Sequence, residues 1–210
     1  MDIVPIKATT LTPFNYGHLA IQGGVATLPE LIGDRAIAFA LCAALGLMRS
    51  SSVLPAKDYK GHLSAMPWRT SVLTTDAPRL LPPIARRSDL GVEGGYPEKV
   101  RRATASGNFK EFFSIQEVPV GQEFRGAVFG VDPFALAGAG APRFVVRIGS
   151  NRTGMLLVER DGGVSGVRLN AATAALFGRH LPVERYVLAE MQMTHEMPLA
   201  EAAAEVTSWT

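Results

Sequence analysis

The sequence has little cysteine, no long apolar run and almost no excess charge, and each shortage narrows what the protein can be. Among its 210 residues only Cys42 is a cysteine, which excludes a disulfide within the chain and argues against a thiolate metal site. Cys42 lies inside an apolar helical run, so we expect a packed thiol and not a nucleophile. The longest mainly apolar run, Ala36 to Met48, is too short to span a bilayer.

The beginning of the chain lacks the basic-then-apolar order of a secretion signal, and we therefore expect a cytoplasmic protein. The formal net charge is only +2, so any binding of nucleic acid must depend on local basic patches. A content of 47% hydrophobic and 19% charged residues is the balance of a folded globular protein. We predict a single domain over residues 1–210.

Motifs for metal, cofactor and acid–base chemistry are also missing. There is no His-x-Glu, Cys-x-x-Cys or His-Glu-x-x-His spacing and no Gly-Lys-Ser/Thr phosphate loop. We therefore predict no metal site and no cofactor. Among the four histidines, His18 in the N-terminal loop close to Tyr16 is the best candidate for a general base. Because no second acid or base accompanies it in the sequence, we predict that the protein has no catalytic residue and is not an enzyme.

The most informative stretch is the region of residues 143–158, where two apolar runs flank a polar loop bounded by glycines. Such short apolar runs are typical of buried strands. Gly149 and Gly154 can take backbone angles closed to other residues, which lets successive N–H groups converge on a phosphate. Arg147 and Arg152 add charge and forked donors. The loop is a candidate phosphodiester cradle, and an ordinary hairpin with two surface arginines is the alternative.

Positive charge is concentrated between residues 79 and 110. The basic residues there are Arg79, Arg86, Arg87, Lys99, Arg101, Arg102 and Lys110, and the acids are Asp89, Glu93 and Glu98. Repeated proline and glycine oppose a long helix or a regular central strand. Several aromatic residues favour an arm that contacts a partner, because disordered linkers seldom carry them. We predict an inserted basic thumb at about residues 79–115, with a solvated loop as the alternative.

The remaining elements follow from the spacing of apolar residues. Strands are predicted at Ile3–Leu11, Trp68–Thr75, Phe124–Phe129, Arg143–Ile148, Met155–Glu159 and Leu181–Met193. The first is followed by a loop through Gly24. Asp34 is predicted to cap a helix that ends near Arg49, and Pro198 to precede a helix over Leu199–Val206. This mixture of strands and helices predicts an α+β sandwich.

Three blocks of sequence, taken in their order, resemble a known family. They are Gly33–Leu41 (GDRAIAFAL), Gln122–Phe129 (QEFRGAVF) and Pro142–Gly149 (PRFVVRIG) with the loop that follows. On these blocks the chain resembles the RAMP subunits of CRISPR Cascade complexes, most closely the type I-D Cas-five-like group, often called Csc-one. The likeness weakens beyond Arg160, and the middle of the chain matches in arrangement only.

The resemblance implies an α+β, ferredoxin-like (RNA-recognition-type) RAMP fold with an inserted basic thumb. It implies a non-catalytic subunit of a type I surveillance complex that caps the 5′ handle of the CRISPR RNA (crRNA). The implied partners are the crRNA, the large subunit and the backbone subunit, with target DNA beside the protospacer as a further implied contact and no membrane. The implied RNA-binding residues are Arg86, Arg87, Lys99, Arg101, Arg102, Arg147, Gly149, Ser150, Asn151, Arg152 and Gly154.

One departure from RNA-recognition modules is clear, because their aromatic sheet motif is absent from this sequence. Stacking of bases on an open sheet face is therefore not expected. Two alternatives remain open at this stage. One is a metal-independent crRNA-processing endoribonuclease with His18 as its base, and the other is a protein-interaction module without a nucleic-acid role.

Overall fold

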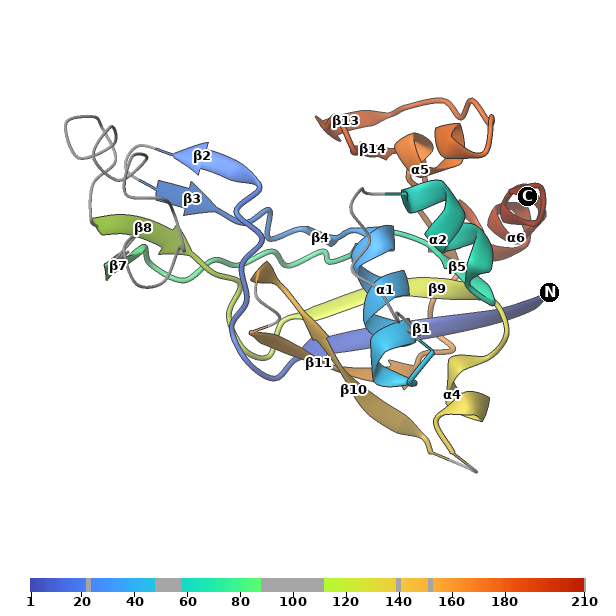
Figure 1. Ribbon diagram of the computed structural model, residues 1–210, viewed down its shortest axis with the longest axis horizontal. Coiled ribbons are helices and arrows are strands. Elements are labelled where there is room, and N and C mark those ends of the chain that lie inside the picture. The colour runs from blue at the N-terminus through green and yellow to red at the C-terminus, as the bar shows by residue number, and fades with distance from the viewer. Residues whose placement is uncertain (22–23, 48–57, 88–111, 139–140, 151–152, 210) are drawn as a thin grey trace.

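An antiparallel sheet of seven strands forms the centre of the molecule (Figure 1). The computed structural model describes residues 1–21, 24–47, 58–87, 112–138, 141–150 and 153–209. The strand order is β10-β11-β1-β9-β6-β4, and β5 also pairs with β9. The strands are β1 (Asp2–Thr10), β4 (Leu31–Ile32), β5 (Trp68–Thr70), β6 (Leu73–Thr74), β9 (Glu123–Gly130), β10 (Arg143–Ile148) and β11 (Gly154–Arg160).

β1 lies inside this sheet, and apolar and polar residues alternate along it. Val4, Ile6 and Ala8 are buried on one face, whereas Lys7 lies on the opposite face, as the two-residue period of a strand requires. β1 pairs antiparallel with β9 on one side and with β11 on the other. One face of the sheet is thus buried in the core.

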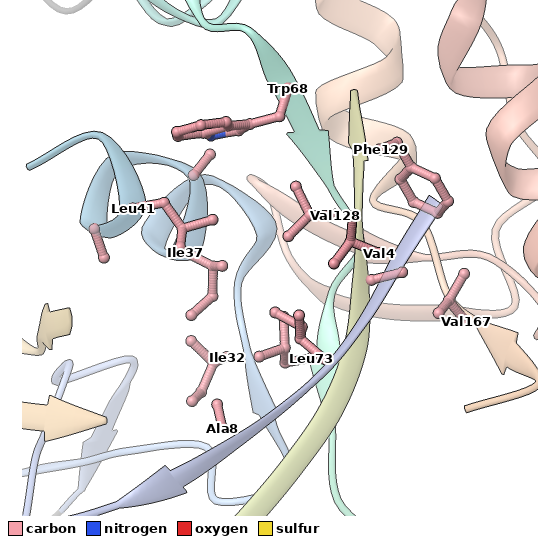
Figure 2. Close-up of a cluster of buried hydrophobic side chains, with 14 of the residues drawn as sticks. Val4, Ala8, Ile32, Ile37, Leu41, Trp68, Leu73, Val128, Phe129 and Val167 are labelled. Atoms are coloured by element: carbon pink, nitrogen blue, oxygen red, sulfur yellow. The ribbon is translucent and has the colours of Figure 1, made fainter. Parts of the chain in front are cut away.

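Helix α1 covers that buried face. Ile37 and Leu41 are fully buried and lie one turn apart. Figure 2 shows them facing the same interior as Val4 and Val128 of the sheet, with Trp68 at one end of the cluster. The helices are α1 (Asp34–Ala44), α2 (Tyr59–Ala65), α4 (Pro133–Leu136), α5 (Ala171–Leu176) and α6 (Leu199–Thr207).

The C-terminal segment covers part of the other sheet face. Helix α6 contacts β1 and β9 and buries Ala202 and Val206. Trp209 stacks on Phe177, with ring centroids 5.8 Å apart, and so ties the end of the chain to the residue after α5. The short strands here are β12 (Gly166–Val167), β13 (Arg185–Leu188), β14 (Met191–Met193) and β15 (Met197–Pro198).

A second, four-stranded sheet projects from the body as an arm (Figure 1). Its order is β2-β3-β8-β7, formed by β2 (Leu19–Ile21), β3 (Gly24–Ala26), β8 (Phe112–Gln116) and β7 (Ile84–Arg87). β3 and β8 run parallel, with Gly24 opposite Ser114. A Cβ atom at Gly24 would lie 1.9 Å from the carbonyl oxygen of Ser114, so only glycine permits this approach. The arm is built from two separate parts of the chain.

The α+β class predicted from the sequence is confirmed, and several local predictions are wrong. Helix α1 ends at Ala44 and not near Arg49, and the predicted strand Trp68–Thr75 is divided into β5 and β6. The predicted loop through Gly24 contains the β2–β3 hairpin, which is paired to a distant strand that local sequence does not reveal. Gly33, not Asp34, is the N-cap of α1, because the Asp34 carboxyl turns inward. The single predicted strand Leu181–Met193 is the hairpin β13–β14, which turns at residues lacking the usual glycine or asparagine.

Candidate nucleic-acid interface

The arm joins the body at a segment that we call the arm root, residues 14–18 between β1 and β2. Phe14 and Val118 form an antiparallel bridge, in which the Val118 N–H donates to the Phe14 carbonyl oxygen at 2.9 Å. The Tyr16 N–H donates to the Thr27 hydroxyl oxygen at 2.9 Å. The arm root is therefore held by both of the chain segments that build the arm.

The glycine-bounded loop packs directly on the arm root. Gly149 has φ +81°, and a Cβ atom there would lie 3.1 Å from the Asn15 carbonyl oxygen and 3.2 Å from the Phe14 Cβ. Gly154 is buried, and its Cβ would lie 2.4 Å from the Phe14 Cβ. The Ser150 N–H donates to the Asn15 carbonyl oxygen at 2.7 Å. The two glycines thus permit close packing on the arm root, and the Ser150 amide already has a partner.

Tyr16 connects this loop with the core. Its hydroxyl has a hydrogen bond with the Gly149 backbone, and burial raises the pKa of Tyr16 to about 12. Its ring lies edge-on to Phe14 at 5.6 Å, and Phe14 in turn lies 6.4 Å from Phe124 of β9. On the other side, Tyr16 stacks on His18 at 5.1 Å with an interplanar angle of 25°. A continuous series of rings therefore runs from the central sheet to the base of the arm.

The Tyr16–His18 pair forms one wall of a cavity of about 550 Å³ between the arm root, α1 and the β13–β14 hairpin. Two further rings line it, Phe39 of α1 and Tyr59 of α2, at 6.3 Å from each other and nearly perpendicular. The Arg35 guanidinium lies 4.8 Å from the centre of the Tyr59 ring. We call this cavity the ring pocket. Its size is within the range of about 300–1,000 Å³ that is usual for small-molecule sites.

The charged groups of the ring pocket are already paired. The Arg35 Nε donates to the Thr173 hydroxyl oxygen at 3.0 Å, and its Nη1 lies 3.3 Å from Glu190 Oε2. Burial raises the pKa of Asp34, and hydrogen bonds with Thr173 and Asn170 partly oppose this rise. The Asn170 Nδ2 donates to Asp34 Oδ1 at 2.8 Å. The pocket therefore presents rings and neutralised groups, not a free cation.

Burial favours the neutral form of the His18 ring. Burial lowers the pKa of His18, and the nearby Glu30 carboxylate opposes this shift only in part. The Leu28 N–H donates to His18 Nδ1 at 3.5 Å, so the neutral ring carries its proton on Nε2. Among the described residues no three His, Cys, Asp or Glu side chains lie close enough to hold a metal ion.

The open part of the sheet face carries a neutral charge network. Lys7 Nζ lies 3.3 Å from Glu123 Oε1 and 4.0 Å from Glu159 Oε2. Arg125 pairs with Glu123 and with Asp161, each at 3.0 Å. Arg143 Nη1 lies 4.0 Å from Glu159 Oε1. Acids and bases therefore alternate across four strands, and these charges are paired with one another; Arg147 lies on the same exposed side of β10 as Arg143, nearer the loop.

The described residues among those predicted to bind RNA lie in two places, the β10–β11 hairpin and strand β7. Arg147 is exposed on β10, opposite Met155, and has no partner among the residues that the structure describes. Arg147, Gly149, Ser150 and Gly154 belong to one hairpin at the arm root. Arg86 and Arg87 lie on β7 of the arm, opposite Phe113 and Phe112 in register. The predicted residues Lys99, Arg101, Arg102, Asn151 and Arg152 lie outside the described part of the chain.

The sequence did not predict the ring pocket. Only its first pair carries a local signal, since Tyr16 and His18 are two residues apart. Phe39 and Tyr59 come from two different helices, and nothing in their spacing indicates that they meet.

Within the described ranges no helix is long and apolar enough to cross a membrane.

Comparison with known proteins finds a likeness to a solved structure. No family model matches the chain, and no curated protein matches it. Among solved structures, a chain of a structure described as "Type IV-B CRISPR Complex" superimposes with a TM-score of 0.42 and 9% sequence identity, covering 90% of this chain and 96% of the other.

Proposed function

We propose that the protein is a non-catalytic subunit of a type I CRISPR surveillance (Cascade) complex that binds and caps the 5′ handle of the crRNA. One observation carries this proposal: the basic hairpin of Arg147 and the ring pocket meet on Tyr16 at the root of a projecting arm. Single-stranded RNA is held by cationic grooves and by rings on which bases stack. Of the sequence blocks that resemble the RAMP subunits, Gly33–Leu41 contributes Phe39 to the ring pocket and Pro142–Gly149 contributes Arg147.

The order of the main strands supports the ferredoxin-like part of the proposal. β11, β1, β9 and β5 are adjacent in that order and antiparallel, and α1 crosses between β1 and β5. This is the strand order of a split β-α-β fold. Where a second helix would follow β9, the chain has the short α4 and then β10. We infer a ferredoxin-like core whose second helix is replaced by an additional edge strand.

The paired charges around Lys7 and Arg125 suggest that RNA contacts the end of this sheet face nearest the arm root, where Arg147 is unpaired among the described residues. In this arrangement Arg147 and the arm residues Arg86 and Arg87 contact phosphates, and so do the other basic residues predicted to bind RNA. The large subunit, the backbone subunit and the target DNA beside the protospacer remain the proposed partners. The arm suits such contacts because it projects from the body (Figure 1).

A specific observation keeps one second function open, a metal-independent endoribonuclease. Burial favours the neutral form of His18, which a general base needs, although its one acceptor nitrogen, Nδ1, already accepts the Leu28 N–H. Cleavage also needs a cation to stabilise the charge that develops on the phosphate. The Arg35 guanidinium beside it is already engaged by Glu190 and Thr173. We therefore favour the non-catalytic role.

The proposal is tested by purifying the protein with its complex, sequencing the bound RNA, and measuring the affinity of the protein for that RNA at several salt concentrations. Arg147→Ala should weaken binding and reduce the salt slope by about one unit, because one phosphate contact is lost. Arg125→Ala is the matched control, since Arg125 lies in the same sheet but is paired with two carboxylates. Equal slopes for wild type and Arg147→Ala would contradict the proposal.

A further inference from the structure

We propose that the ring pocket receives one unstacked nucleobase of the bound RNA strand. This inference rests on the proposed function, and it concerns residues that the basic segments do not include. The pocket is defined by Tyr16, His18, Phe39 and Tyr59 with the turn of the β13–β14 hairpin. It adds a site for a base to a surface otherwise described by its phosphate contacts.

The geometry of the rings carries the first step of the argument. Four half-buried rings from three chain segments line one cavity, although side chains of this kind usually fill a core when they are not needed at a surface. Their arrangement leaves room between the stacked pair of Tyr16 and His18 and the perpendicular pair of Phe39 and Tyr59. A planar ligand suits a cavity of this shape because aromatic rings bind it face to face or edge to face.

The charges carry the second step. Arg35 is paired with Glu190, and Asp34 accepts a hydrogen bond from Asn170, so the pocket does not offer the free positive charge that a phosphate requires. Neutral polar groups remain at its rim. The His18 Nε2–H is a donor, and the Tyr59 hydroxyl has no partner among the described residues. Rings with a few polar groups are the surroundings in which proteins bind splayed-out bases.

The position of the pocket carries the third step. Tyr16 is hydrogen-bonded to Gly149 and also lines the pocket, so a base in the pocket would lie beside the hairpin that presents Arg147. A strand that places a phosphate at Arg147 can therefore turn a neighbouring base into the ring pocket. Met191 closes the opposite wall, where its Cε is 2.9 Å from the place of a Cβ at Gly33.

Two variants of the full-length protein test the inference. Tyr59→Ala removes one ring, and Ala189→Trp adds bulk at an exposed turn residue that lines the pocket without removing a structural contact. Tyr186→Ala is the matched control, because Tyr186 is 66% exposed on the same hairpin and does not line the pocket. Circular dichroism and thermal unfolding establish which variants are folded. Loss of one stacking ring should weaken RNA binding by about 5- to 150-fold.

The probe is a single-stranded RNA of about a dozen nucleotides with the sequence recovered from the complex, and one abasic position is moved along it. Wild type should lose affinity sharply at one position, and in Tyr59→Ala and Ala189→Trp that position should no longer matter. A flat abasic profile in wild type, or a profile unchanged in Ala189→Trp, would overturn the inference while leaving the proposed function intact. A wild-type protein that binds no RNA would overturn both.

Discussion

The packing of the glycine-bounded loop on the arm root makes a sharp prediction for Gly149→Ala. Gly149 combines a left-handed backbone, φ +81°, with close contacts to Asn15 and Phe14. Gly121 has nearly the same backbone, φ +76°, but a Cβ there would meet nothing within 4 Å. Comparing Gly149→Ala with Gly121→Ala therefore separates the cost of the backbone angle from the cost of packing against the arm root.

The expected magnitudes follow from these two geometries. An alanine in the left-handed region costs roughly 1–2 kcal/mol, so Gly121→Ala should lower the free energy of unfolding by about that amount. At Gly149 the new Cβ would lie 3.1 Å from a carbonyl oxygen and 3.2 Å from a backbone-proximal carbon, which cannot rotate away. Overpacking of this kind adds roughly 1–3 kcal/mol. We expect a total loss of about 2–5 kcal/mol for Gly149→Ala.

Urea unfolding of the three proteins, followed by circular dichroism, measures both differences. The slope of the transition should stay constant if only stability changes. RNA affinity is measured on the folded proteins in parallel, because the loop also presents Arg147. If Gly149→Ala were no more destabilising than Gly121→Ala, the loop would not be packed on the arm root and our account of the site would be refuted.

Two more outcomes follow, in addition to the salt dependence of Arg147→Ala. Burial raises the pKa of Asp34 above its ordinary value of 3.8. Wild type should therefore lose stability relative to Asp34→Asn as pH rises from 3.8 through the pKa of Asp34 in the folded protein. Urea unfolding between about pH 4 and pH 8 checks this, and parallel curves would contradict it. His18→Ala, in the assembled complex, should leave crRNA length and abundance unchanged on a denaturing gel, whereas loss of mature crRNA would favour the nuclease.

The parts of the fold that the sequence predicted are those whose signal is local. β1, β9, the β10–β11 hairpin and α6 each show their own apolar period, and the structure confirms them. The arm could not be predicted in full because Gly24 pairs with Ser114 far along the chain. The inward turn of Asp34 likewise depends on Asn170, which is 136 residues away.

The candidate site likewise has one part that local sequence predicts and one part that it does not. The hairpin loop of Arg147 could be predicted as a candidate because its glycines and arginines lie close together in the sequence. The ring pocket was missed because its rings come from separate segments, and because the hairpin that closes it was interpreted as one strand. The residues at that turn, Ala189 and Glu190, do not favour turns. Tertiary contacts hold the turn instead, among them the Arg35–Glu190 pair.

Tyr16 makes the two halves of the site physically distinguishable. Burial raises the pKa of Tyr16 to about 12, so its hydroxyl stays neutral at physiological pH and adds no charge to either half. A phosphate at Arg147 is a charge contact that weakens with salt, whereas a base among the rings is held by stacking, which salt weakens far less. As salt rises, the affinity that remains should therefore come increasingly from the ring pocket, and the abasic profile should sharpen while total affinity falls.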